Sequence, residues 1–177
     1  TADKQQNYGG QLSWNQPLPW DVVNHTLTIT SDSYMKNYES AAKTPWYANR
    51  ADIISIVVTE GVTKIGDYAF YGYSNLTSVQ LPDSLESIGN YAFKNCGKLS
   101  EITLPEKVSA IGESAFYGCG LTEITIPSNV TEIADYSFAR NTGLKNITFE
   151  GSAPAIAVHA FSGVKAKAMY PEDDSSW

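Results

Sequence analysis

The chain has 177 residues, of which 42% are hydrophobic and 18% are charged, and its formal net charge is −7. This composition is typical of a folded globular protein and excludes a disordered or fibrous chain. The acidic balance disfavours nucleic acid as a partner, and no apolar run is long enough to span a bilayer, so we expect no membrane insertion.

The first 52 residues are predicted to form a small β cap at the N-terminus. Residues 11–16 and 25–30 alternate apolar and polar side chains and are rich in strand-forming types. Trp46, between Pro45 and Tyr47, is a candidate anchor against the segment that follows. A cap is expected because the repeats described next would otherwise leave an exposed apolar end.

Residues 53–164 repeat one pattern five times. Isoleucine recurs at positions 65, 88, 111, 133 and 156, and phenylalanine at 70, 93, 116, 138 and 161, so the intervals are 23, 23, 22 and 23 residues. The short interval arises because one residue is missing between Cys119 and Leu121, in a predicted loop. A fixed period of this length predicts a solenoid whose stacked coils share one core.

The repeated pattern Ile-Gly-x-x-Ala-Phe, followed by cysteine, leucine and a proline after the strand, resembles the BspA-like leucine-rich repeats. These occur mainly in bacterial surface and secreted proteins. The resemblance implies an α/β leucine-rich-repeat solenoid of about five repeats of 22–23 residues, with a parallel sheet on its concave face. Residues 165–177 would add a last strand and a turn. It also implies a secreted or cell-surface location and a protein-binding or adhesion module of a larger protein, with no enzymatic activity.

The two-residue alternation of a strand turns every second side chain of the sheet toward solvent. These outward residues are our candidate binding surface because solenoids present such faces to their partners. The candidates are Ser78, Gln80, Glu101, Thr103, Glu123, Thr125, Asn146 and Thr148.

Tyr68, Tyr91 and Tyr136 occupy one column on the opposite, convex side. Aromatic rings suit sugar stacking and protein contacts, although packing between coils is the commoner role of such a column. They form an alternative site, with a glycan as the ligand. The corresponding alternative functions are a carbohydrate-binding module or a spacer attached to an extracellular enzyme.

We predict no catalytic residue, metal site or cofactor. Cys96 and Cys119 share an inward column, which favours buried free thiols over a nucleophile or a disulfide. His25 and His159 lie far apart in the sequence, and no motif of a hydrolase, metalloprotease or nucleotide-binding loop accompanies them.

Three acidic residues, Glu60, Asp83 and Glu106, form a column after the strands. Their oxygens suit calcium, but a solvated edge is the commoner explanation of such a column.

The expected partner is an extracellular or host protein, with a glycan as the alternative. We expect a monomer in solution. End-to-end contacts between copies are expected only at high concentration, through residues 1–14 of one chain and the predicted strand that begins at residue 165 of another, because an unpaired strand edge invites such pairing.

Overall fold

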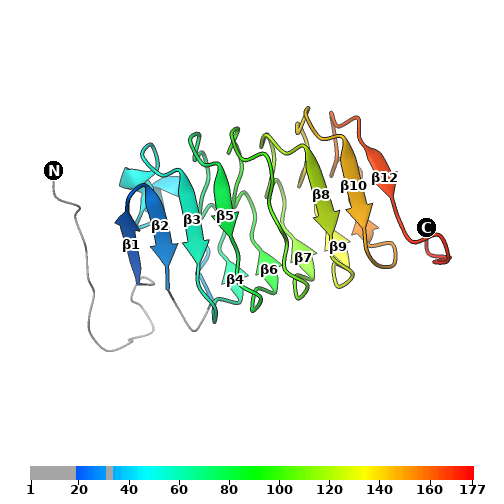
Figure 1. Ribbon diagram of the computed structural model, residues 1–177, viewed down its shortest axis with the longest axis horizontal. Coiled ribbons are helices and arrows are strands. Elements are labelled where there is room, and N and C mark those ends of the chain that lie inside the picture. The colour runs from blue at the N-terminus through cyan, green and yellow to red at the C-terminus, as the bar shows by residue number, and fades with distance from the viewer. Residues whose placement is uncertain (1–18, 31–33) are drawn as a thin grey trace.

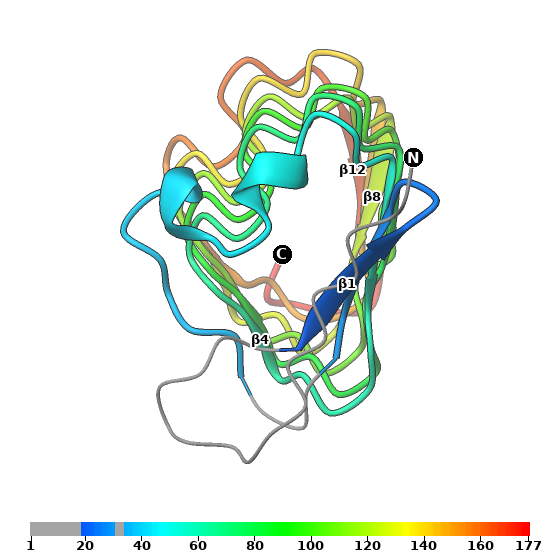
Figure 2. The same ribbon diagram turned by 90° about the vertical axis from the view of Figure 1, so that its left-hand side faces the viewer.

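The computed structural model describes residues 19–30 and 34–177, which form a solenoid of stacked coils with β1 (Trp20–Val23) and the C-terminus at opposite ends of the stack (Figure 1). Viewed along the stack, the coils superpose on one another (Figure 2). The predicted leucine-rich-repeat solenoid with a parallel sheet is therefore confirmed. The predicted strand at residues 11–16, and residues 1–14 as a contact segment, lie outside the described residues.

One side of the solenoid carries the longer strands, which we call the broad sheet; it corresponds to the predicted concave face. It has two portions, with strand orders β1-β2-β3-β5 and β8-β10-β12. The strands are β1 (Trp20–Val23), β2 (Thr26–Ile29), β3 (Ser55–Val58), β5 (Ser78–Gln80), β8 (Glu123–Ile126), β10 (Asn146–Phe149) and β12 (Lys167–Met169).

A second, narrow sheet consists of two-residue strands and runs without a break in the order β11-β9-β7-β6-β4. Its strands are β4 (Lys64–Ile65), β6 (Ser87–Ile88), β7 (Ala110–Ile111), β9 (Glu132–Ile133) and β11 (Ala155–Ile156). The repeated isoleucines are the second residues of these strands, and those of the first four coils are buried. Within the described residues the helical segments are the 3-10 turns η1 (Ala41–Lys43) and η2 (Tyr47–Asn49).

The repeated phenylalanines form a ladder through the core. Neighbouring rings have centroids 5.2 to 5.3 Å apart from Phe70 to Phe161, and all pairs are stacked except the first, whose rings are tilted by 33°. The backbone N–H of Phe93 donates to the carbonyl of Ala115 at 2.8 Å, and that of Phe116 donates to Ser137 at 2.7 Å. The hydrogen bonds between coils therefore set the spacing at which the rings stack.

Trp46 closes the N-terminal end of this ladder, as its position before the first repeat led us to expect. It is fully buried, stacks on Phe70 at a centroid distance of 5.9 Å, and donates from Nε1 to the carbonyl of Ala69 at 2.8 Å. Trp20 and Tyr38 contact its ring edge-on. Strand β2 pairs in parallel with β3, so the cap also extends the broad sheet, whereas β1 pairs antiparallel with β2.

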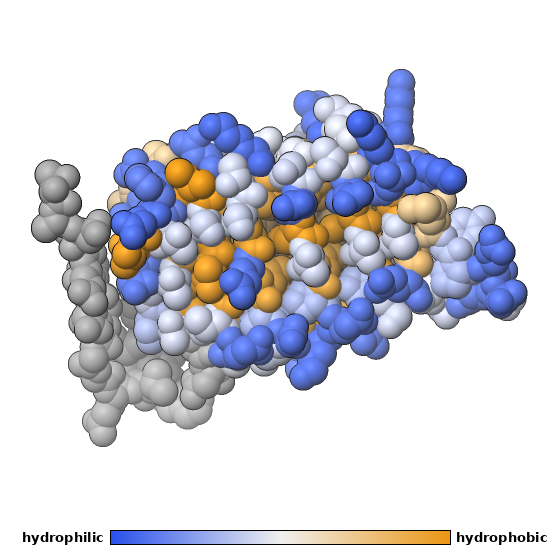
Figure 3. All heavy atoms as spheres, in the orientation of Figure 1, coloured by the Kyte–Doolittle hydropathy of each residue, from blue (hydrophilic) through white to orange (hydrophobic). Residues whose placement is uncertain are grey.

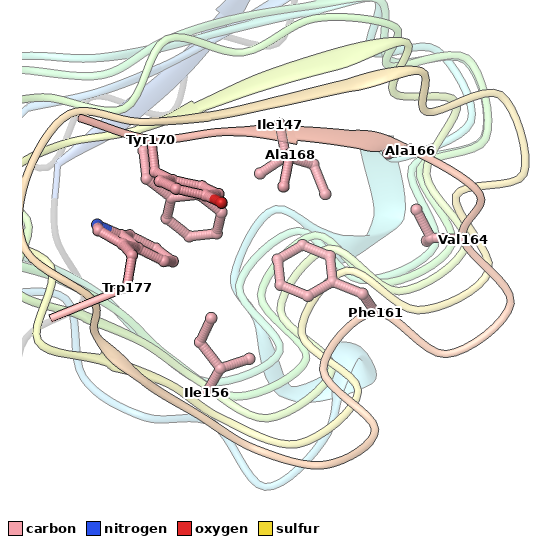
Figure 4. A pocket seen from close by; sticks show the side chains of 9 residues that line it. Ile147, Ile156, Phe161, Val164, Ala166, Ala168, Tyr170 and Trp177 are labelled. Carbon is pink, nitrogen blue, oxygen red and sulfur yellow. The ribbon is translucent and has the colours of Figure 1, made fainter. Parts of the chain in front are cut away.

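The C-terminal end is only partly closed. Trp177 folds back, stacks on Tyr170 at 5.0 Å and donates to the carbonyl of Gly151 at 3.1 Å. An apolar hollow of about 380 Å³ remains beside Phe161 and Ile156 (Figure 4). Phe161 is consequently half-buried, whereas the other rings of the ladder are fully buried.

The broad sheet is interrupted between β5 and β8. Residues 101–104 lie there in the coil order, but they form no strand and make no backbone hydrogen bond with other described residues. The interruption is next to the coil that lacks one residue, and the narrow sheet and the phenylalanine ladder continue past it. The repeat predicts a continuous sheet, and only the narrow sheet is continuous.

The ladder predicts unequal costs of truncation along the stack. Phe116→Ala should lower the free energy of unfolding by about 3–5 kcal/mol, as for a buried phenylalanine. Phe161→Ala should cost less, because its ring has an aromatic neighbour on one side only. Chemical denaturation of both variants measures the difference, and equal losses would contradict the stacking order.

Candidate functional site

The eight predicted binding residues all lie on the broad-sheet side. Strands β5, β8 and β10 carry six of them, and Glu101 and Thr103 lie on the interrupted segment between β5 and β8. All are exposed except Thr148, which is half-buried. In the register of β8 and β10, Glu123 is opposite Asn146 and Thr125 is opposite Thr148. The strand alternation therefore places them together on one face, and whether they bind a partner stays a prediction.

A hollow of about 440 Å³ opens on this face at the interruption of the sheet. Ile102, Leu104, Val79 and Ile124 line it, although their positions in the repeat are inward. Ile102 and Leu104 have exposed fractions of 9% and 6%, and Val79 is half-buried. Figure 3 shows a band of hydrophobic residues along the middle of this face with hydrophilic residues on both sides. The broad face thus combines a polar surface with a local apolar floor.

Glutamates surround that floor. Glu101 and Glu123 line the hollow at the start of the strands, and Glu106 and Glu150 line it just beyond their ends. All four are exposed, and the structure gives none of them an ion pair with another described residue. The hollow is therefore bordered by uncompensated negative charge.

The convex tyrosine column is divided into two stacked pairs. Tyr68 stacks on Tyr91 with centroids 4.8 Å apart, and Tyr136 stacks on His159 at 5.0 Å. Ser114 occupies the column between the pairs. The three tyrosines of the alternative site therefore form no continuous stripe, and part of their ring surface packs between coils.

Tyr68 and Tyr91 nevertheless border a second surface hollow. It measures about 440 Å³ and is lined also by Tyr47, Tyr71 and Lys94, beside the 3-10 turns of the cap. The Lys94 ammonium lies 5.1 Å from the Tyr91 ring centroid. Aromatic walls with one cation are a suitable environment for a sugar or a protein side chain.

The two cysteines are buried free thiols, with exposed fractions of 0% and 5%. Cys96 Sγ donates to the carbonyl of Phe70 at 3.3 Å, and Cys119 Sγ to that of Phe93 at 3.1 Å. In the next coil Asn141 takes the same place and donates to the Phe116 carbonyl at 2.8 Å. Burial raises the pKa of the Cys96 thiol well above its usual value. This column therefore supplies donors to the core.

The remaining polar candidates make local contacts. His25 Nδ1 lies 2.9 Å from the carbonyl oxygen of Asp52, and His159 pairs with Asp135 at 3.2 Å. Glu60 accepts hydrogen bonds from the backbone N–H groups of Asp83 and Ser84 in the next coil. Within the part of the chain that the structure describes, no three histidine, cysteine or acidic side chains are grouped to hold a metal.

Sequence reasoning missed a ladder of side chains that joins the coils beside the narrow sheet. Asp67 Oδ1 accepts from the N–H of Asn90 at 2.8 Å, and Asn90 Oδ1 accepts from the N–H of Glu113 at 2.8 Å. Glu113 instead accepts from the Tyr91 hydroxyl at 2.6 Å, which raises the pKa of Tyr91 to about 12. The run of Asp, Asn and Glu directly after the Ile-Gly pair was the available signal.

Thiol labelling tests the assignment of the cysteine column. In the native protein neither Cys96 nor Cys119 should react with a thiol reagent, because both are shielded from solvent, and because burial raises the pKa of the Cys96 thiol. After denaturation both should react. Rapid labelling of either thiol in the folded protein would contradict its place in the core.

Comparison with known proteins supports the same architecture. The family model described as "BspA type Leucine rich repeat region" matches six copies over residues 46–172. A comparison with curated proteins found no match. No helix among the described residues is long and apolar enough to cross a membrane.

Three solved structures illustrate the likeness. A leucine-rich repeat protein from Eubacterium ventriosum is 25% identical with a TM-score of 0.62, over 76% of this chain and 42% of that protein. The T. pallidum leucine-rich repeat protein is 21% identical with a TM-score of 0.58, and the match covers 78% of this chain and 71% of that protein. The pneumococcal vaccine antigen PcpA is 23% identical with a TM-score of 0.57, and the match covers 85% of this chain and 37% of that protein. This chain thus spans less than half of the first and third proteins. With the repeat register and the family match in agreement, the chain belongs to the BspA-type leucine-rich-repeat family.

Proposed function

We propose that the broad-sheet face binds a protein partner outside the cell, as an adhesion or protein-binding module of a larger bacterial surface or secreted protein. The observation that carries this proposal is the exposed polar row on β5, β8 and β10, together with the apolar-floored hollow between them. Stacked coils hold these side chains on a rigid framework, so a partner can bind without paying to order them.

The surface location in this proposal is supported by the family and by the shared fold of PcpA, which is described as a vaccine antigen. Binding is favoured over catalysis by the surroundings of the nucleophilic and basic groups. The thiols are buried donors to backbone carbonyls, and the histidines lie in the cap and the last coil. A catalytic site needs such groups within hydrogen-bond distance of each other.

A second candidate function is glycan binding at the tyrosine-lined hollow beside the cap. The hollow with Tyr47, Tyr71 and Lys94 favours it, since sugar rings stack on exposed aromatic faces. The stacking of Tyr68 on Tyr91 weighs against it, because it leaves less ring surface free. We therefore rank it below the broad face.

An array of purified extracellular proteins and glycans tests both functions. The variant with alanine at Gln80, Glu101, Thr103, Glu123 and Thr125 should lose the protein partner. It should remain folded, because an exposed substitution usually changes stability by about 0.5 kcal/mol or less at each position.

The matched variant carries alanine at Tyr68, Tyr91 and Tyr136 and should keep the partner. If the five-residue variant binds as well as the unmodified chain, the broad face is not the binding site. Loss of a glycan in the tyrosine variant alone would establish the second function instead.

A further inference from the structure

The interruption of the broad sheet creates a feature that the repeat itself does not specify. Residues 101–104 lie between two hydrogen-bonded portions of the sheet, and their backbone N–H and C=O groups have no backbone partner among the described residues. Strand backbone without ladder partners is available to an added extended chain. Ile102 and Leu104 line the hollow, and their largely buried side chains lie beneath this segment of backbone.

The charges around the hollow restrict what can enter it. Glu101 and Glu123 border one end of the apolar floor, and Glu106 and Glu150 border the other. The chain as a whole carries a net charge of −7. An anionic ligand would be repelled at both ends, whereas a ligand with a cation at each end gains two attractive contacts.

We propose that this hollow binds an extended peptide with cationic side chains at both ends of a short apolar stretch. The proposal rests on the broad face being the binding face. Glu101 and Glu106 are five residues apart and Glu106 lies in a turn, so at most about 16 Å separates them, since an extended chain advances roughly 3.3 Å per residue. A peptide that lies along the strands therefore places its two cations no more than about five residues apart.

Other ligand classes fit this hollow less well. A glycan would find no aromatic side chain along its walls, which consist of aliphatic, threonine, serine and glutamate residues. A divalent cation would need several acidic side chains grouped around one point, and no such group occurs within the described ranges. A peptide whose side chains alternate between apolar and polar, with a cation at each end, matches the apolar floor and its two acidic ends.

Fluorescence anisotropy with defined peptides tests the proposal. The probe is a fluorescein-labelled peptide in which valines alternate with threonines between two terminal arginines. It should bind the unmodified chain, and Glu101→Gln with Glu123→Gln should weaken binding roughly tenfold, because the peptide's cation at that end loses both of its carboxylate partners. The matched control is Glu86→Gln with Glu132→Gln, which removes the same charge from exposed positions around the narrow sheet and should leave binding unchanged.

A second peptide, with serines in place of the valines, separates specific binding from attraction by charge alone. It should bind clearly more weakly, because it offers nothing to the apolar floor. Equal binding of the two peptides, equal effects of the two glutamate pairs, or no binding of the first peptide would each overturn the proposal. If the five-residue alanine variant still loses its protein partner in that case, the proposed function stands and only the peptide assignment fails.

Discussion

The hydrogen bonds between successive coils are the constraint on which the rest of this structure depends. They fix the distance from coil to coil near the strand spacing of about 4.8 Å, so each residue type meets its own kind in the next coil. Phenylalanine rings stack at 5.2 to 5.3 Å as a direct consequence. The carbonyls at three of the ring positions also accept hydrogen bonds from side chains of the neighbouring coil, and the donors are Cys96, Cys119 and Asn141.

The same spacing explains the glycine that follows isoleucine in the first three coils, whereas alanine takes this position in the last two. A Cβ atom at Gly89 would lie 2.7 Å from the backbone nitrogen of Asp67, closer than real Cβ atoms approach. The tight contact lets the Asp67 carboxylate reach the N–H of Asn90 in the next coil. The close backbone approach at the glycine, the ladder of side-chain hydrogen bonds and the phenylalanine stack therefore all depend on the same distance between coils. Together they hold the exposed row of the broad sheet rigid, which is the property that a recognition surface requires.

Much of this architecture could be predicted from the period alone, because a ladder repeats each local environment. Inward isoleucines, the phenylalanine stack and the outward polar row all follow from the spacing of residues. The interruption of the broad sheet could not. Residues 101–104 read Glu-Ile-Thr-Leu, and β8 reads Glu-Ile-Thr-Ile, yet only the second forms a strand. Since the local pattern is the same, the difference arises from how neighbouring coils meet, and the hollow that results is a tertiary property. The sequence shows that Ser114 interrupts the tyrosine column. The stacking within each pair depends on the distance between coils, which the sequence does not show.

Amide hydrogen exchange, resolved by residue, tests the central claim most directly. If the bonds between coils determine the structure, the amides of Phe93 and Phe116 should exchange slowly, since both donate to the next coil. The amides of residues 101–104 should exchange much faster, despite the buried side chains of Ile102 and Leu104, because they have no ladder partner. Equal protection of residues 101–104 and of strands β5 and β8 would contradict the account, because it would mean that the broad sheet is continuous.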